Sequence, residues 1–371
     1  MKHLNQYITE YIIKKKLDKP IDSENYYKYY PKTKEELIEN IKECFSNDDY
    51  DLNYIDTKAI TDMSNLFNIN FYNHPIINNK TNNINISKWN VSNVINMKLM
   101  FNGFENFNCD LSGWDVSNVE DMNSMFSFCK NFTGKGLENW DVSNVKDMKV
   151  MFYNCENFDC DLSNWDVSKV ENMYTMFEGC SKFKGKGLDN WNVSNVENMS
   201  NIFSYCFAFD CDLSKWNVSN VTNTSCMFYH CHNFKAKGLE NWNVSKVTHF
   251  EYMFSYCDNI TDIDLSKWNV SNGIYFNLMF YKCEKFKGNG LEKWSLDNAE
   301  YMSNMFEYCE NFDCDVSNWK MSKAETIKYM FSYCVNFTGK GLNKWKLTPK
   351  TEINKALDHC NINKLPSWYK T

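Results

Sequence analysis

Residues 140–165 read WDVSNVKDMKVMFYNCENFDCDLSNW, and this stretch is one complete copy of a pattern that runs through most of the chain. Tryptophan marks every copy, with gaps of 25 or 26 residues, at Trp89, Trp114, Trp140, Trp165, Trp191, Trp216, Trp242, Trp268, Trp294, Trp319 and Trp345. A degenerate first copy begins at Ile55, and Trp368 follows the last full one. A fixed period of this length predicts a repeat solenoid, here of about twelve units, in which each unit packs on its neighbours.

Two hydrophobic periods alternate inside each repeat. In the run Phe158–Leu162, apolar residues alternate with aspartates, which predicts a half-buried strand. After the tryptophan, Val119, Met122 and Met125 recur at three-residue steps, which predicts a short helix or 3-10 turn. A serine and a glutamate three residues later fit a capping box at its start, as in Ser117/Glu120, Ser168/Glu171, Ser194/Glu197 and Ser322/Glu325. We therefore expect a β-solenoid with parallel strands and short helical or 3-10 turns.

The predicted strands are of two alternating kinds. One kind carries outward acidic or amide side chains, at Asn108/Asp110, Asp159/Asp161, Asp210/Asp212, Asp262/Asp264 and Asp313/Asp315. The other is one residue longer and mostly basic, at Thr133/Lys135, Lys184/Lys186, Lys235/Lys237, Lys287/Asn289 and Thr338/Lys340. Stacking strands of opposite charge avoids repulsion at a spacing of about 5 Å. The sequence therefore predicts a structural unit of two repeats, about 51 residues long.

The two ends differ from the repeats, and this predicts three parts. Residues 1–50 form a helical N-terminal cap, residues 51–347 form the solenoid, and residues 348–371 form a C-terminal cap. Residues 32–45 predict a helix, since Thr33 and Glu36 fit a capping box and Leu37, Ile41 and Phe45 share one face. Upstream, the spacing of apolar residues predicts another amphipathic helix, at Leu4, Tyr7, Ile8, Tyr11 and Ile12. This helix is expected to cover the first repeat or, alternatively, to dock on a membrane surface or a partner. Phe71–Asn83 predicts a surface loop, and Thr348-Pro349 a last helical turn.

Cysteine recurs fifteen residues after the tryptophan, at Cys129, Cys155, Cys180, Cys206, Cys231, Cys257, Cys283, Cys309, Cys334 and Cys360. This column is either a metal or redox ladder or a line of buried free thiols. The second interpretation is favoured, because free cysteine packs as a small hydrophobe and no C-x-x-C pair supplies a tetrahedral site. A second column, Cys109, Cys160, Cys211 and Cys314, is interpreted in the same way.

His230, Cys231 and His232, with Cys226 nearby, are the best cluster of candidate zinc ligands. Cys231, however, belongs to the core column, and the two histidines stand where other repeats carry Tyr205, Tyr256 or Asp258. We therefore predict no metal ligands, and likewise no catalytic residues and no cofactor, because no nucleotide-binding, hydrolase or metalloprotease motif occurs.

Composition narrows the classes of function. A net charge of −7 and a pI near 5.5 argue against nucleic-acid binding, which requires a surplus of clustered Lys and Arg. No stretch approaches the length of an apolar membrane span, and residues 1–10 lack the features of a signal peptide. We expect a chain that stays in the cytoplasm.

Residues 140–155 and 158–165 resemble the BspA-like leucine-rich-repeat family, whose repeat is also found in mycoplasma lipoproteins and in giant DNA viruses. The stretches 31–41 and 60–67 look like the segment that precedes its first repeat. The resemblance covers about residues 31–370. It implies a right-handed, leucine-rich-repeat-type solenoid with a role in protein binding or surface adhesion. The Asn- and Lys-rich composition fits a giant-virus member of the family, located in the host cytoplasm, better than a secreted bacterial member.

Three classes of function are compatible with these features of the sequence. The leading hypothesis is a non-enzymatic scaffold for protein–protein interaction, because the repeats offer a long surface without a pocket motif. The second is a structural or surface component, adhesin-like, of a virion or a cell. The third is an enzyme, which nothing on the repeat grid supports. The partner and the oligomeric state are not specified by the sequence.

Overall fold

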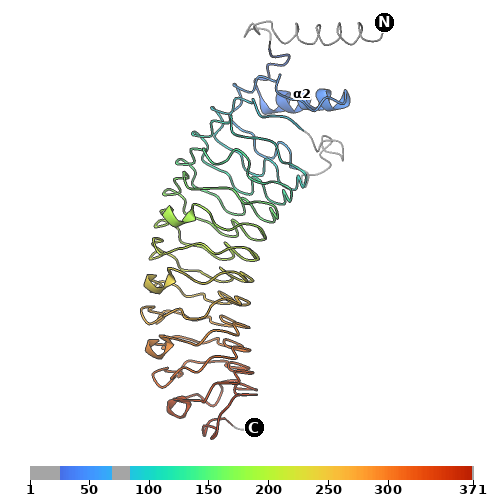
Figure 1. The fold of residues 1–371 in the computed structure, drawn as a ribbon. Helices are drawn as coiled ribbons and strands as arrows, with labels where there is room; N and C mark the ends of the chain where they lie inside the picture. The colour runs from blue at the N-terminus through green and yellow to red at the C-terminus, as the bar shows by residue number, and fades with distance from the viewer. Residues whose placement is uncertain (1–25, 69–83, 370–371) are drawn as a thin grey trace, which may run out of the picture.

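The computed structural model describes residues 26–68 and 84–369, and it shows an elongated stack of rungs, each rung being one repeat of 25–26 residues (Figure 1). The predicted repeat solenoid is confirmed. Helix α2 (Lys34–Ser46) lies at the N-terminal end of the stack. Short 3-10 helices occur in alternate rungs: η3 (Leu188–Asn190), η4 (Leu239–Asn241), η5 (Leu291–Lys293) and η6 (Leu342–Lys344). The predicted helix around Leu4–Ile12 and the predicted loop Phe71–Asn83 lie outside the described residues.

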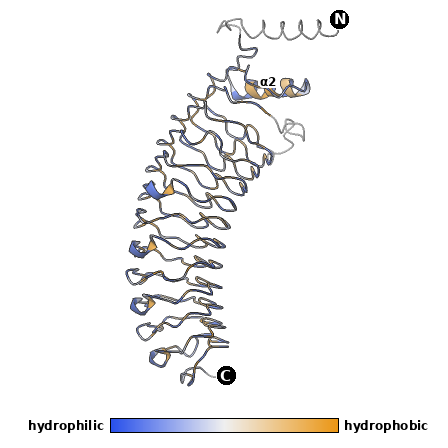
Figure 2. Cartoon of the chain, viewed as in Figure 1, coloured by the Kyte–Doolittle hydropathy of each residue, from blue (hydrophilic) through white to orange (hydrophobic). Residues whose placement is uncertain are grey.

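The interior consists of columns of identical side chains. The repeat tryptophans Trp89 to Trp345 are each at most 5% exposed. Phenylalanines stack nearly parallel from rung to rung, with ring centroids 5.7 Å apart between Phe126 and Phe152 and 5.5 Å apart between Phe152 and Phe177. Figure 2 shows hydrophobic and hydrophilic residues alternating along every rung. Each rung therefore buries one set of side chains against the rungs above and below it.

One segment of each rung carries most of the backbone hydrogen bonds between rungs. We call it the ladder segment; in the rung that begins at Trp114 it comprises residues 121–129. Its alternate amides donate to carbonyls of the next rung: Met122 to Asp147 (3.1 Å), Ser124 to Lys149 (3.0 Å), Phe126 to Met151 (2.9 Å) and Phe128 to Tyr153 (2.6 Å). The N–H groups of these residues thus point toward the next rung, and the carbonyls of the residues between them point toward the previous one.

The predicted strands are wrong in detail. Among the described residues no run is long enough to count as a strand, and the rungs share only single parallel bridges, such as Asp121 with Asp147 and Asp147 with Asn172. These bridges fall at the start of the ladder segment, not in the predicted strand Phe158–Leu162. In that run the amide of Leu162 donates to the carbonyl of Lys186 (3.1 Å), so a few isolated bonds replace a sheet.

The predicted helical turns are also wrong, because the ladder segment takes left-handed backbone at two places. Ser124 has φ of 55° and Phe128 has φ of 61°, which no α-helix accommodates. The capping boxes do not form either. Asp115 Oδ1 accepts both the amide (3.1 Å) and the hydroxyl (2.7 Å) of Ser117, so the recurring V-S-N segment is an Asx turn. The amide of Glu120 donates to Ile95 of the previous rung (2.8 Å).

The pairing of rungs is confirmed by three kinds of contact. Tryptophans stack two by two, as Trp165 does with Trp191, with centroids 6.3 Å apart and planes 4° apart. Ion pairs link an acidic rung to the basic rung that follows, as between Asp161 and Lys186 (2.8 Å). The 3-10 helices follow glycines with positive φ, such as Gly187 at 92°, and occur only in the longer rungs of the described part.

The N-terminal helix agrees with its prediction. Thr33 accepts the amide of Glu36 (3.2 Å), and the buried face of α2 presents Leu37, Ile41 and Cys44 to the first rung, while Phe45 is half-buried. At the other end, residues 348–351 form a single hydrogen-bonded turn in place of the predicted helical turn. Trp368 stacks on Trp345 at 5.6 Å. The predicted boundaries at residues 50 and 347 stay predictions.

Candidate interaction surface

The first cysteine column lies wholly within the packed interior or at its C-terminal edge. Each thiol donates to the carbonyl of a phenylalanine in the preceding rung at 2.9–3.1 Å, as Cys155 does to Phe126. Burial raises the pKa of the Cys155 thiol far above its ordinary value, which suppresses the reactive thiolate. None of the sixteen cysteines forms a disulfide. The column therefore acts as packing with a built-in hydrogen bond.

The second cysteine column explains the glycines of the basic rungs. A Cβ added to Gly134 would lie 2.6 Å from the Cβ of Cys160, and one added to Gly185 would lie 2.8 Å from the Cβ of Cys211. The thiol side chains thus fill the space that each glycine leaves. Burial raises the pKa of Cys160 to about 12, so this column too consists of structural thiols.

The two histidines of the candidate zinc cluster lie close together but serve other contacts. His230 Nδ1 lies 3.4 Å from His232 Nε2, and His232 Nδ1 lies 2.8 Å from a carboxylate oxygen of Asp258. Cys231 is buried and bonded to Phe203 (3.0 Å), so its thiol is turned away from the histidines. Within residues 26–68 and 84–369, no three side chains of the types that bind metals are arranged to hold an ion.

The outward charges of the paired rungs are largely neutralised within the chain. Lys186 is hydrogen-bonded to Asp161, and this contact, together with that of Ser163, lowers the pKa of the Asp161 carboxyl to about 2. Equivalent pairs join Lys135 to Asp110 (3.0 Å), Lys237 to Asp212 (2.7 Å) and Lys340 to Asp315 (3.1 Å). A face whose charges are already paired offers little electrostatic attraction to a partner.

The ladder segments of the C-terminal half carry a different kind of surface. The residue before each core cysteine is aromatic or basic in every rung from Tyr205 onward, and these side chains stack on one another. His230 lies between Tyr205 (4.9 Å, 9° between planes) and Tyr256 (4.1 Å, 12°). Tyr308 stacks on Tyr333 at 4.6 Å. Lys282 completes the row, with its ammonium 5.1 Å from the Tyr256 ring and 5.6 Å from the Tyr308 ring.

A second row of tyrosines runs beside the first. Tyr229 meets Tyr205 edge-on at 5.2 Å, with 82° between their planes, and Tyr281 meets Tyr256 at 5.4 Å and 70°. We use the name tyrosine face for the two rows and the exposed ring next to them: Tyr205, Tyr229, His230, Tyr252, Tyr256, Tyr281, Lys282, Tyr308 and Tyr333. Tyr205, Tyr252 and Tyr333 are each 36–38% exposed, so a solvent-accessible aromatic surface crosses these rungs.

The same positions in the N-terminal rungs are mostly small or polar. Where the C-terminal rungs carry Tyr205, Tyr256 and Tyr308, the earlier rungs carry Gly103, Asn154 and Gly179, although Phe128 and Tyr153 form one edge-on aromatic pair there (4.9 Å). The core columns are alike in both halves, so packing does not explain the difference. The signal for this face in the sequence is the recurrence of Tyr before the core cysteine, at Tyr205, Tyr256, Tyr308 and Tyr333, which does not by itself show that the rings stack.

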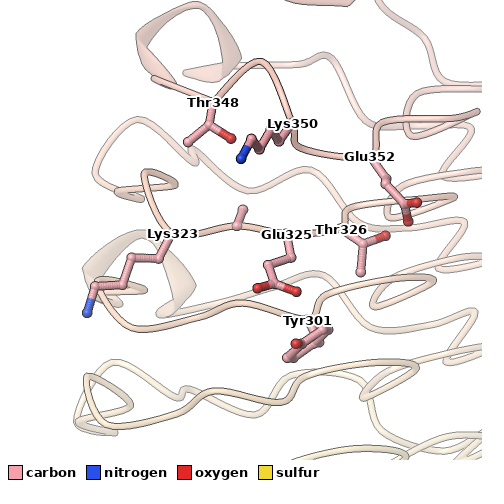
Figure 3. Close-up of a pocket in the computed structure, with 8 residues that line it drawn as sticks. Tyr301, Lys323, Glu325, Thr326, Thr348, Lys350 and Glu352 are labelled. Atoms are coloured by element: carbon pink, nitrogen blue, oxygen red, sulfur yellow. The ribbon is translucent and has the colours of Figure 1, made fainter.

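Two open hollows lie on the neighbouring V-S-N side of the same rungs. One, of about 500 Å³, is lined by side chains of three successive rungs, among them Tyr301, Glu325 and Lys350 (Figure 3). The other, of about 630 Å³, includes Thr248 and Ile274. Figure 3 shows lysine, glutamate and threonine side chains spread over the surface of the first hollow, without a group of acids or bases gathered around one point.

No helix of the described part has the length and apolar character needed to traverse a lipid bilayer.

Similarity to individual known proteins is weak or absent. No curated protein matches the sequence. Among solved structures, the functional domain of InlJ from Listeria monocytogenes, which includes a cysteine ladder, aligns at 10% identity with a TM-score of 0.16. The alignment covers 67% of this chain and 58% of that chain, so this chain spans less than two thirds of the domain's length. A TM-score this low gives no basis for inferring a common fold.

The family match, by contrast, extends along nearly all of the solenoid. The profile of a family described as "Mycoplasma protein of unknown function, DUF285" matches in overlapping copies at residues 36–159, 74–186, 128–237, 151–262, 207–290 and 258–368. These overlapping matches follow the repeats seen in the structure, and together they cover much more than half of the chain. The chain therefore belongs to the DUF285 repeat family.

Proposed function

We propose that the chain is a non-enzymatic scaffold that binds a protein partner through the tyrosine face. The observation that carries this proposal is the unbroken row of aromatic and basic side chains from Tyr205 onward, in which the rings of successive rungs stack. Stacking between rungs accounts for part of this surface, but it does not require the ring edges of Tyr205, Tyr252 and Tyr333 to be exposed. A binding surface gains contact area from them at a small cost in side-chain entropy.

The packing of the face supports a role in binding. The His230 ring is held between the rings of Tyr205 and Tyr256, so the orientation of this part of the row is restricted before a partner arrives. Rings that are already ordered lose less conformational freedom on association, and this leaves more of the contact energy as affinity. The Lys and Asp side chains of the strand-like run offer a partner less, because their charges already pair with one another.

The family resemblance of the repeats adds a setting to this proposal. We take the chain to be a BspA-like, leucine-rich-repeat-type member of its family with a giant-virus-like, cytoplasmic setting, as the resemblance implies. Location in a virion or on a cell surface is the alternative. Protease treatment of intact particles, followed by proteomics, distinguishes the two settings.

Affinity capture from native cells with the full chain tests the scaffold role. The decisive variant is Tyr256→Asn combined with Tyr308→Asn, because Asn154 already occupies the same position in an earlier rung with a similar φ of 56°. We expect the wild-type chain to recover a stoichiometric protein partner and the double variant to lose it.

Tyr174→Ser is the matched control for this experiment. Tyr174 is 41% exposed in an earlier rung, and Ser200 occupies the equivalent position one rung later. The control variant should recover the partner as the wild type does. Equal recovery by all three proteins would show that the tyrosine face is not the binding surface.

A further inference from the structure

We infer that the C-terminal end of the solenoid binds an extended acidic peptide segment. The backbone carbonyls of this segment pair with the open edge of the last rung (residues 353–359), and its carboxylates pair with the lysines around that edge. This surface is separate from the tyrosine face, so the inference goes beyond the proposed function. Three observations lead to it: backbone donors without acceptors, lysines without acidic partners, and a recurring turn that lysine replaces.

The hydrogen bonds between ladder segments all run in one direction. In the rung that begins at Trp114, the carbonyls of residues 121, 123, 125 and 127 accept from the rung before. The amides of residues 122, 124, 126 and 128 donate to the rung after. Peptide groups of successive rungs are thus aligned head to tail, as they are in a helix, and their dipoles add. The positive, donor end of this array lies at the C-terminal end of the stack (Figure 1).

The donor end of the array is open at the last rung. Carbonyls of alternate residues there accept from the rung before at 2.8–3.0 Å: Glu352, Asn354, Ala356 and Asp358. The amides of Ile353, Lys355 and His359 correspond to the donors of earlier rungs, but they have no acceptor within residues 26–68 and 84–369. The fourth amide, that of Leu357, lies beside the side chain of Tyr369. Such an edge pairs with a segment that offers carbonyl oxygens at every second residue, as each ladder segment does to the one before it.

The lysines around the open edge have no acidic partners. Residues 344–369 contain five lysines and two acids, although the whole chain has a net charge of −7. All five are exposed, and none takes part in an ion pair within the described part of the chain: Lys344, Lys346, Lys350, Lys355 and Lys364. Of the two acids, Glu352 already pairs with Lys328 of the preceding rung (2.7 Å). Carboxylates of a bound segment would supply the partners that these cations lack.

The residue after the repeat tryptophan shows lysine in place of a turn-forming residue. In the rungs before Ser295 it is Asn or Asp, and its side chain accepts the amide of the serine two residues on, as Asp166 does (3.0 Å). In the last two full rungs it is Lys320 and Lys346, which offer no acceptor, so this turn loses a hydrogen bond. Lys320 pairs with Asp297 (3.2 Å), whereas Lys346 lines a hollow of about 340 Å³. A local rule that is broken toward one end of a solenoid indicates a role outside the fold.

A peptide fits this end better than a second copy of the chain or a nucleic acid. Two open edges cannot pair with each other, because each presents donors only. The acceptor end of the array lies against helix α2, whose Lys34 contacts Asp62 (3.2 Å) and Ser64 (2.8 Å) of the first ladder segment. Apolar side chains beside the lysines, such as the exposed Leu365 and the half-buried Ile353, suit the side chains of a peptide. The negative charge of the whole chain opposes the approach of a nucleic acid.

Fluorescence anisotropy with the full chain tests this inference. The probe is a labelled peptide of about nine residues in which aspartate and threonine alternate. One comparison peptide carries asparagine in place of every aspartate, and a single-stranded RNA of equal length represents a second class of polyanion. The wild-type chain should bind the aspartate peptide and should bind the asparagine peptide and the RNA about tenfold more weakly or not at all. Equal binding of either comparison molecule would overturn the inference.

The variants assign binding to the lysines of this end. The triple variant Lys344→Asn/Lys346→Asn/Lys355→Asn should weaken binding of the aspartate peptide by about tenfold or more. Asparagine occupies the same three positions in other rungs, so the fold should be retained: Asn318, Asn269 and Asn304.

A matched control makes the same change of charge in the middle of the solenoid. It is the triple variant Lys169→Asn/Lys215→Asn/Lys246→Asn, and neighbouring rungs again carry asparagine at each position: Asn195, Asn190 and Asn220. The control should bind the peptide as the wild type does. Equal weakening by both triple variants would show a general effect of net charge and would contradict a site at the C-terminal end.

Hydrogen exchange followed by mass spectrometry locates the bound peptide. The aspartate peptide should slow exchange in residues 352–360 and leave residues 249–257, the equivalent segment of an inner rung, unchanged. Binding without protection of residues 352–360 would place the peptide elsewhere and overturn the inference. So would self-association in sedimentation experiments that the first triple variant abolishes, since a second copy would then be the occupant.

The tyrosine face provides an independent comparison. The double variant Tyr256→Asn/Tyr308→Asn should bind the aspartate peptide as tightly as the wild type, even where it loses the protein partner. Failure of the scaffold proposal therefore leaves this inference standing, and loss of peptide binding in the double variant would count against a separate C-terminal site.

Discussion

Cysteine and tryptophan recur at fixed positions because each brings one polar hydrogen into the core. Trp140 Nε1 donates to the carbonyl of Leu111 in the rung before it (3.2 Å), and Cys155 donates to Phe126 (3.0 Å). These bonds satisfy buried carbonyl groups that a purely apolar column would leave without a hydrogen-bond donor. Each position of these columns thus combines side-chain volume with one hydrogen-bond donor, a combination that neither alanine nor valine provides.

Replacement of a ladder cysteine should separate these two contributions. Cys155→Ala removes both the volume and the donor in a fully buried site, and we expect it to lower the free energy of unfolding by about 2 kcal/mol. Cys155→Ser keeps a donor and should cost less. Urea denaturation of the two variants measures the difference. A serine variant that is less stable than the alanine variant would mean that the thiol serves only as apolar filling.

A single methyl group at Gly136 should be more damaging than one at Gly113. The Gly136 Cβ would lie 2.2 Å from the backbone nitrogen of Ser112, and φ there is 93°. Gly136→Ala should therefore cost about 1–3 kcal/mol, because the conformation is strained and the neighbour is backbone that cannot rotate away. The Gly113 Cβ would be 3.0 Å from one carbonyl oxygen, without positive φ, so Gly113→Ala is the milder control in thermal unfolding. Equal melting temperatures for the two variants would contradict this account of the G-x-G segment.

At the scale of elements, the ladder segment shows why local pattern gave the wrong secondary structure. The three-residue steps of Val119, Met122 and Met125 are those of a helix, and all three side chains are buried as a helix face would be. The amide of Ser124 nevertheless bonds to the next rung, at Lys149, and its φ is 55°. Several bonds to the neighbouring rung outweigh the modest helix propensity of so short a segment.

The row of stacked rings should make stability depend on pH through His230. Burial, followed by the charge of His232, lowers the pKa of His230 below its ordinary value of 6.5, and the smaller effects of Asp258 and Lys282 oppose and assist this shift, respectively. The unfolded state therefore binds a proton more readily than the folded state. Stability is complete above pH about 6.5 and falls as the pH decreases below it.

His230→Tyr provides the test, since Tyr205 and Tyr256 occupy the same position in adjacent rungs. The variant should lose part of the decrease in melting temperature between pH about 7 and about 5 that the wild type shows. Urea midpoints at the same two pH values provide a second readout. Identical pH profiles for the two proteins would show that His230 titrates equally in the folded and unfolded states.

At the scale of the whole molecule, the chain is a one-dimensional array in which each rung touches only the rungs above and below. Damage should therefore spread locally. Val145→Asp places a carboxylate among fully buried side chains. It should lower the free energy of unfolding of the affected rungs by about 3 kcal/mol or more.

Hydrogen exchange followed by mass spectrometry locates this damage. In the Val145→Asp variant, peptides that cover 116–129 and 167–180 should lose protection, while peptides that cover 321–334 should change least. The matched surface variant Lys146→Gln, in the adjacent exposed position, should leave all three regions nearly unchanged. Uniform loss of protection along the chain would indicate one cooperative unit instead of a nearest-neighbour array.

Recurrence of residue types at regular spacing is enough to predict the period, the columns of like residues, the pairing of rungs and the burial of the free thiols, and a local capping and apolar pattern predicts the N-terminal helix. The backbone conformation of the ladder segment and the stacked rings of the tyrosine face arise from how the rungs pack on one another. Both depend on contacts between residues about 25 positions apart, such as Tyr205 with His230. Local propensity does not contain those contacts, and they supply enough hydrogen bonds and ring contacts to override it.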